Sequence, residues 1–393
     1  MNKKLSMAVA GAVMAFGASA ANAGITIPAG DWTIDIGGNV NAYYTHTELD
    51  EALDVAGEDT ANTIQTGLLP SAIGIGGKTR QNDLDIAFQF TFFVGSDSGN
   101  GGSLGGNSLN IRQSYMTFGD KSWGTIKAGR DLGIFGSDAI LSDMTLLGVG
   151  IGAGRGGTST LGRIGSGYMY ADWVGQISYA SPNWNGFSFA VGVREPWSNG
   201  ASNTTIRSDM GYEGKVAYEW AGDYAGKVWA GFISQKHSDD TGPVVDDYTS
   251  RGWELGAKTT IAGFGLVGYY YEGDGLSGST TSLATGSALV PNGALFFAND
   301  NDSDDEGGYV QVTYALPGIG TKLGASWGIS KSESDVNGVE FENESWMVGA
   351  YHPLTKSLNL VAEYTDNELE NLGYVSGVDG EAQTISLGAI LFF

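Results

Sequence analysis

The sequence contains no cysteine and only three histidines among 393 residues. It therefore has no disulfide framework, no thiolate nucleophile and no cysteine-ligated zinc. The histidines are His46, His237 and His352, and they lie too far apart to show the spacing of a metal site. No resident metal or cofactor is expected.

Two short patterns are typical of enzymes, but both lack the structural context that the chemistry needs. Gly324–Gly328 reads GASWG and matches G-x-S-x-G, yet it lies within an alternating segment and not at a strand-to-helix turn. The glycines at 152, 154 and 157 fit G-x-G-x-x-G without a surrounding βαβ unit. An enzyme is therefore not expected.

Basic residues are scarce: 20 Lys and Arg stand against 44 Asp and Glu, for a formal net charge of -24. Binding to nucleic acid phosphates needs clustered basic residues. No nucleic acid partner is expected.

Long apolar runs are absent beyond the first residues. Lys3 and Lys4 precede an apolar stretch from Leu5 to Ala20, which is followed by the small residues Ala21 and Ala23. This is the pattern of a signal peptide with its cleavage site. A membrane anchor is the alternative, although the stretch is shorter than the ~20 residues of a spanning helix. We predict a cleaved signal peptide over 1–23 and a single domain over 24–393.

Glycine is abundant, at 63 residues, but it follows no three-residue period and alternates with aromatic residues, which excludes collagen and flexible linkers. Instead, apolar residues recur at every second position, for example from Asp83 to Val94, as in a strand with one apolar and one polar face. Sixteen such segments are predicted: 32–45, 67–80, 83–94, 109–119, 123–131, 172–180, 186–194, 209–220, 226–236, 251–261, 264–272, 308–316, 321–330, 344–352, 358–366 and 382–393.

The connections between these segments alternate between short turns and long loops. An even strand count with this alternation is typical of an outer-membrane barrel, in which short turns face the periplasm and long loops face outside. A soluble β-sandwich also alternates. However, no charged residue falls in the middle of an apolar face, where Lys or Arg facing lipid costs about 2–4 kcal/mol. The sequence therefore favours an all-β fold, a transmembrane antiparallel β-barrel with 16 strands.

Two stretches of the chain resemble the general porins of Gram-negative outer membranes: RQSYMTFGDKSWGTIKAGRD from Arg112 to Asp131, and YMYADWVGQISYASPNWNGFSFAVGV from Tyr168 to Val193. The resemblance covers essentially the whole mature chain. It implies a homotrimer of barrels in the outer membrane, in contact with lipid and lipopolysaccharide, with the third external loop folded into the lumen. It also implies that Phe393, the last residue, is the assembly signal. The implied function is passive diffusion of small hydrophilic solutes and ions.

The longest connection, 132–171, is the candidate for the loop that narrows the lumen. Selectivity in such a channel is set by the charges around its narrowest part. We expect acidic residues of this loop, Asp138 and Asp143, to face a basic wall cluster of Arg112, Lys127, Arg130, Arg194 and Lys215. Strict alternation points Arg130 outward unless a bulge intervenes. Lys78 and Arg80 are expected nearer the periplasmic mouth.

The predicted external loops hold 28 acidic and four basic residues, which makes the outer rim strongly acidic. The rim favours a modest cation preference, because it raises the local cation concentration. Asp300, Asp302 and Asp304 alternate like the start of a calcium loop but lack its glycine and bidentate glutamate, so a solvated loop is preferred over weak divalent binding. A substrate-specific channel, an outer-membrane enzyme such as a lipase or protease, and a surface adhesin are the alternatives to a general porin.

Overall fold

A computed structural model describes residues 24–53, 59–96, 109–152, 159–196, 209–239, 246–276, 303–333, 338–372 and 375–393. The predicted signal peptide lies outside these residues and stays a prediction. Neither of the two short helices in the described chain is long and apolar enough to cross a membrane.

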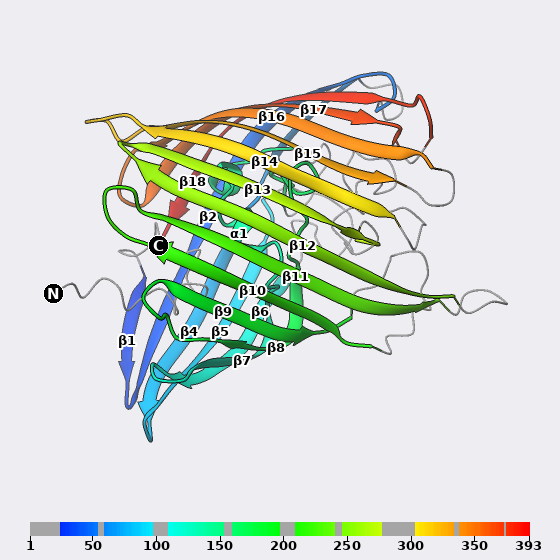
Figure 1. Cartoon of the computed structure of the whole chain (residues 1–393). Coiled ribbons are helices and arrows are strands. Elements are labelled where there is room, and N and C mark those ends of the chain that lie inside the picture. Colours follow the sequence, from blue (N-terminus) through cyan, green and yellow to red (C-terminus); the bar gives the residue numbers. More distant parts are fainter. Residues whose placement is uncertain are drawn as a thin grey trace.

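The described residues form a sheet of eighteen strand segments in which neighbouring segments run antiparallel (Figure 1). The segments are β1 (Ile25–Ala29), β2 (Trp32–Leu49), β3 (Thr60–Gln65), β4 (Ser71–Gln81), β5 (Leu84–Val94), β6 (Asn110–Asp120), β7 (Gly124–Leu132), β8 (Trp173–Ala180), β9 (Phe187–Arg194), β10 (Gly211–Trp220), β11 (Gly226–Asp239), β12 (Asp246–Ile261), β13 (Phe264–Asp274), β14 (Asp304–Ala315), β15 (Lys322–Glu333), β16 (Glu340–Pro353), β17 (Leu358–Glu370) and β18 (Gly380–Phe392).

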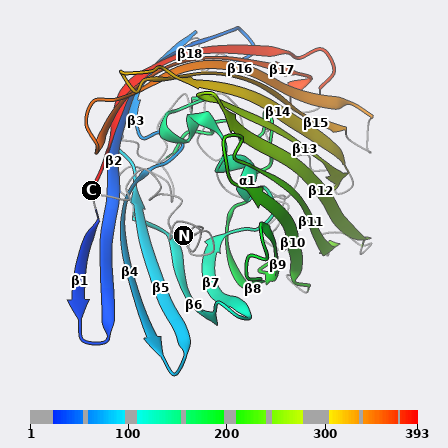
Figure 2. The same ribbon diagram turned by 60° about the vertical axis from the view of Figure 1, so that its left-hand side comes forward.

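These segments occupy sixteen positions around a closed barrel (Figure 2). Along one edge of β2, β3 pairs with residues 43–48 and β4 pairs with residues 33–39, so β3 and β4 together fill one strand position. On the other side, β18 and β1 share a position in the same way, and the pairing of β18 with β2 closes the barrel. The prediction of a sixteen-stranded antiparallel barrel is confirmed.

The connections at one end of the barrel are short. The turn between β4 and β5 consists of Asn82 and Asp83, both with positive φ, and the turn between β12 and β13 consists of Ala262 and Gly263, also with positive φ. Positive φ at both central residues is what a two-residue hairpin turn of type I′ requires. The longer connections lie at the opposite end, as the sequence predicts.

Some strand boundaries differ from the prediction. Residues 67–70, predicted as strand, separate β3 from β4. At the long-loop end several strands extend further than predicted: β2 reaches Leu49, β11 reaches Asp239, and β14 begins at Asp304. Polar residues on both faces conceal these extensions, because the apolar alternation stops where the strand leaves the apolar band.

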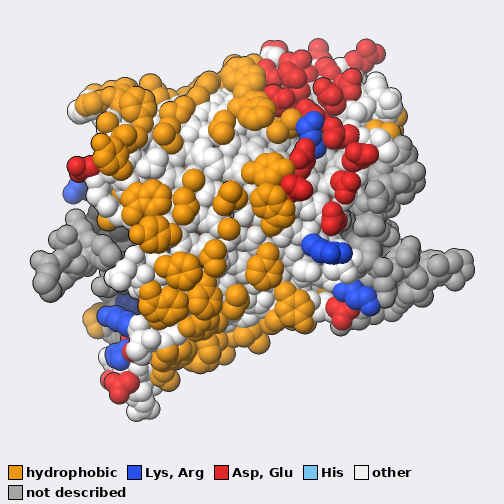
Figure 3. Space-filling model, in the orientation of Figure 1, with side chains coloured by type: hydrophobic (Ala, Val, Ile, Leu, Met, Phe, Trp, Pro, Cys, Tyr) orange, Lys and Arg blue, Asp and Glu red, His pale blue; other side chains and the backbone are white. Residues whose placement is uncertain are grey.

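The outward face carries a broad apolar band (Figure 3). Exposed apolar side chains such as Leu255, Val310 and Leu387 belong to it. At the long-loop ends of β14–β17, acidic side chains replace them (upper right in Figure 3). Pairs such as Glu272 with Glu306, and Glu344 with Glu368, lie directly opposite each other in the register there. The predicted acidic outer rim is therefore present among the described residues.

Candidate functional site

The connection between β7 and β8 lies inside the barrel (Figure 2). This inner segment, residues 133–172, contains the short helix α1 (Ser137–Ile140) and a 3-10 turn at Met144–Leu147; its residues 153–158 are outside the described chain. The helix starts after Gly136, whose φ of 74° is in the left-handed region that favours glycine.

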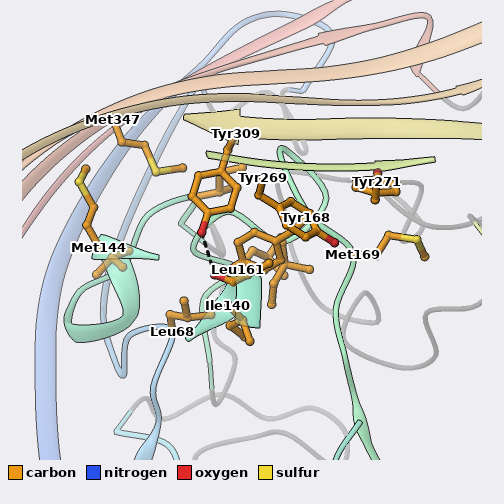
Figure 4. Packing of buried hydrophobic residues seen from close by; sticks show 14 of the residues in the cluster. Leu68, Ile140, Met144, Leu161, Tyr168, Met169, Tyr269, Tyr271, Tyr309 and Met347 are labelled. Carbon is orange, nitrogen blue, oxygen red and sulfur yellow. Dashed lines mark hydrogen bonds between the residues drawn. The ribbon is translucent and has the colours of Figure 1, made fainter. Parts of the chain in front are cut away.

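The inner segment packs against the barrel wall through an apolar and aromatic core (Figure 4). Met144 and Leu161 of the segment are buried with Met347 of β16 and Leu68 of the strand-free connection 66–70. Tyr309 of β14 donates its hydroxyl proton to the carbonyl oxygen of Ala139 at 2.8 Å. The segment is thus docked on the wall by a packed interior and does not hang freely in the lumen.

Three buried glutamates of the wall accept hydrogen bonds from backbone N–H groups of the inner segment. Glu213 of β10 accepts from Ile134 and Phe135. Glu254 of β12 accepts from Gly136 at 2.9 Å, and Glu363 of β17 accepts from residues 149 and 150 at 2.7 and 2.9 Å. Buried carboxylates are tolerated when such donors replace water. The glutamates therefore fix the backbone path of the segment.

Asp138 of α1 is held by two lysines of the wall. Its carboxylate oxygens lie 2.8 Å from Nζ of Lys215 on β10 and 2.5 Å from Nζ of Lys227 on β11. Burial alone would raise the pKa of Asp138, but the two ammonium groups outweigh it and hold that pKa well below its usual range. Asp138 therefore faces Lys215 of the expected basic cluster, and the contact is a direct ion pair because the helix rests on that wall.

Asp143 also lies within the docked segment and is 5 % exposed. It accepts the hydroxyl proton of Tyr168 at 2.8 Å and caps the 3-10 turn through the N–H of Thr145 at 2.9 Å. Arg163 lies nearby, fully buried, and donates to Ser326 and Ser345 of the wall. The hydrogen bonds of Asp143 are therefore internal to the segment, and they do not join it to the basic residues that it was expected to face.

The predicted basic residues divide into side chains that form ion pairs with wall carboxylates and side chains that lie beside the end of the inner segment. Arg194 lies 2.6 Å from Glu213, and Lys127 pairs with Asp131. Arg112 is 5 % exposed, because a register shift between residues 91 and 92 lets it turn inward, and its guanidinium lies over the ring of Phe93 at 5.0 Å. The charges of Arg112, Arg130 and Arg194 all act on Asp172 at the end of the inner segment.

Arg130 departs from the predicted cluster. It pairs in register with Ser114 and Gly175, three positions along β7 from Lys127, and its side chain is exposed. Alternation puts these positions on the face opposite to Lys127. The register therefore gives Arg130 the outward parity that strict alternation predicts, while its charge still acts on Arg112 and Asp172.

The remaining predicted residues lie near the short-turn end or outside the described chain. Lys78 pairs with Asp35 at 2.9 Å, and Arg80 pairs with Asp85 and Asp120 at 2.8 and 3.0 Å. The last residue, Phe393, exchanges two backbone hydrogen bonds with Gly38, which ties the chain end to β2. Asp300 and Asp302 are outside the described residues, and the described residues, which include Asp304, contain no acidic or histidine cluster suited to a metal ion.

Sequence reasoning missed several residues at the site. Glu213 and Glu254, which anchor the inner segment, are not among the predicted site residues. Lys227, which binds Asp138, is likewise not among them. Position along a strand misleads here because barrel strands tilt and their register is staggered. The signal that was available is the run of charged residues on the inward faces of β10–β12.

The sequence matches the profile of the Gram-negative porin family over residues 8–372. The chain belongs to the Gram-negative porin family. It is accordingly an outer-membrane channel for the diffusion of solutes, and not an enzyme. A search of curated protein sequences found no match.

Solved structures of other outer-membrane proteins share the fold of this porin. The anion-selective porin from Comamonas acidovorans is 17 % identical, with a TM-score of 0.63 over 92 % of this chain and 100 % of that one. The outer membrane channel DcaP of Acinetobacter baumannii is 15 % identical, with a TM-score of 0.68 over 93 % and 99 %. The trimer form of OmpT from Vibrio cholerae is 15 % identical, with a TM-score of 0.55 over 92 % and 99 %.

Proposed function

We propose that this porin lets small hydrophilic solutes and ions diffuse passively, with only weak selectivity for charge. The observation that carries the proposal is the pairing of charges around the inner segment. Asp138 is matched by Lys215 and Lys227, Glu213 by Arg194, and Asp131 by Lys127. A channel selects strongly when charges of one sign line its narrowest part. Paired charges of both signs favour weak selectivity.

The acidic outer rim gives the channel a preference for cations over anions. Glu306, Glu333, Glu368 and Glu370 are exposed at the long-loop end of the barrel. An acidic entrance raises the local concentration of cations, but salt screens it over a Debye length of about 10 Å at 0.1 M. The preference for cations should therefore be modest and should weaken as the salt concentration rises.

Reversal potentials in planar bilayers test this proposal. The same concentration ratio of KCl is imposed across the membrane at a low and at a tenfold higher mean concentration. A small cation preference that shrinks at high salt is expected. A clear anion preference at low salt would contradict the role of the rim, and saturable block by one class of solute would favour a substrate-specific channel.

We also propose that three copies assemble in the outer membrane, with the apolar band against lipid and the acidic rim beside lipopolysaccharide. The shared fold with a trimeric outer-membrane protein supports a trimer. Conductance steps that appear in groups of three, together with crosslinking to a trimer, are expected. Assembly should depend on Phe393, and removal of this residue should lower the yield of inserted channels without changing the conductance of those that form.

A further inference from the structure

Two lysines face each other directly on the inner wall. Lys227 of β11 and Lys258 of β12 are partners in the strand register, and both side chains are partly buried on the inward face. Like charges placed directly opposite across two strands repel each other. Something must compensate the second positive charge, because partial burial weakens the screening by water.

The carboxylates around this lysine pair are already engaged. Asp138 uses one oxygen for Lys227 and the other for Lys215. Oε1 of Glu219 lies 3.4 Å from Nζ of Lys227, so Glu219 also forms an ion pair with Lys227. Lys258 has no carboxylate within ion-pair distance among the described residues. Its ammonium donates a hydrogen bond to the hydroxyl oxygen of Ser142 at 3.2 Å.

Two donors of this group lie side by side, the Lys258 ammonium and the Ser142 hydroxyl. The ammonium of Lys258 has three N–H donors and uses one for Ser142, and the hydroxyl of Ser142 accepts that bond and keeps its own proton to donate. Ser142 is itself partly exposed and follows α1 on the inner segment. A neighbouring N–H and O–H, with a second ammonium opposite, match the oxygens of a carboxylate or phosphate group.

We propose that Lys258 and Ser142, assisted by Lys227, form a binding subsite for oxyanionic solutes beside the docked inner segment. The ligand is a carboxylate or phosphate group, which accepts hydrogen bonds from the Lys258 ammonium and the Ser142 hydroxyl. Lys227 contributes charge and stays bound to Asp138. This inference rests on the proposed diffusion function and names a class of solute that the channel retains on its way through.

The test measures how inorganic phosphate and succinate affect the KCl conductance of single channels in planar bilayers. Both should reduce the conductance saturably, whereas uncharged glucose at the same osmolarity should not. Comparing phosphate with succinate tells whether the subsite favours one oxyanion. The test variants are K258Q, S142A and the conservative K258R. The matched control is K78Q, which removes a lysine of the inner wall that pairs with Asp35.

In K258Q the phosphate concentration for half-maximal block should rise by about tenfold, since a charge-assisted hydrogen bond and a full charge are lost. S142A should show a rise of about threefold, because it loses a neutral hydrogen bond. K258R should retain block within about twofold, and K78Q should match the wild type. Single-channel steps in each variant show that the barrel has formed.

The outcomes distinguish failure of the subsite from failure of the diffusion function on which it rests. Normal conductance steps without saturable block in the wild type would overturn the subsite and leave the diffusion function standing. Equal weakening of block in K258Q and K78Q would also overturn it, because the effect would then be general lumen charge. Absence of conductance steps in the wild type would refute the diffusion function, and the subsite with it.

Discussion

Replacing Asp138 by asparagine removes the negative charge on which α1 is held. In the wild type this carboxylate neutralises two lysines, Lys215 and Lys227, whose side chains are 23 % and 14 % exposed. Asparagine has nearly the same shape and can still accept one hydrogen bond through its amide oxygen. The substitution therefore changes the charge of the inner wall by +1 and changes its packing little.

The size of the effect follows from the distance between this charge and a passing ion. An added unit charge about 6 Å from the ion path, in water-like surroundings, shifts the energy of a monovalent ion by about 0.7 kcal/mol. This corresponds to a change of about threefold in the local concentration of that ion. The ratio of cation to anion permeability should fall by at least that factor in D138N, because the two ions shift in opposite directions.

Reversal potentials in a KCl gradient measure this ratio directly. The matched control is D35N, which removes the carboxylate partner of Lys78 from the short-turn end of the barrel. D138N should shift the reversal potential toward anions well beyond the shift of D35N, with the thermal unfolding midpoint of the barrel little changed. An unchanged reversal potential in D138N would show that ions do not pass close to α1, and would refute the placement of the narrow part there.

Three further outcomes are expected. E363A leaves two buried backbone N–H groups without an acceptor, at a cost of about 1–3 kcal/mol each, so the inner segment should loosen and single-channel current noise should rise. The control E363Q keeps an acceptor oxygen and should stay quieter. Noise in E363Q close to that of E363A would contradict the anchoring role of Glu363. R112Q should shift selectivity toward cations, by up to about threefold on the same Coulomb estimate, and an unchanged reversal potential would place Arg112 outside the ion path. The two lysines hold the pKa of Asp138 in the folded protein below its unfolded value of about 3.9, so the contribution of Asp138 to docking is present above about pH 3.9 and is lost as the pH falls through the folded pKa. The difference in reversal potential between wild type and D138N should therefore stay constant from pH 7 to pH 5. A titration of this difference within that range would disprove the ion pairing.

Alternation in the sequence was sufficient to predict the barrel, because each strand meets water on one face and lipid on the other. In β5, the outward residues are all apolar from Leu84 to Val94, while the inward ones include Asp85 and Gln89. The period of two therefore reports both the strand and its orientation. The same reasoning fails at 67–70, where an apolar-rich stretch leaves the sheet to meet the inner segment. There Leu68 donates its backbone N–H to the carbonyl of Gly148.

The docking of the inner segment could not be read from the sequence, because its contacts join residues far apart in the chain. Glu363 binds the N–H of Val149 across 214 residues, and Lys227 reaches Asp138 across 89. No local pattern encodes such pairs. What the sequence did contain was the set of charges on the inward faces, and their pairing could be seen only once the closed barrel had brought β10–β12 and β17 around the segment.

The position of the narrow part is consequently determined more by the wall than by the segment itself. Its anchors lie on β10, β12, β14 and β17, and three of them are carboxylates that bind backbone N–H groups, which every residue but proline possesses. The segment's side chains could vary while its path is kept. Gly148 is an exception, because a Cβ there would lie 2.0 Å from the Glu363 carboxylate. Since the carboxylates and their donors are buried together, displacing the segment would leave both unsatisfied, and this cost makes the narrow part a fixed component of the barrel.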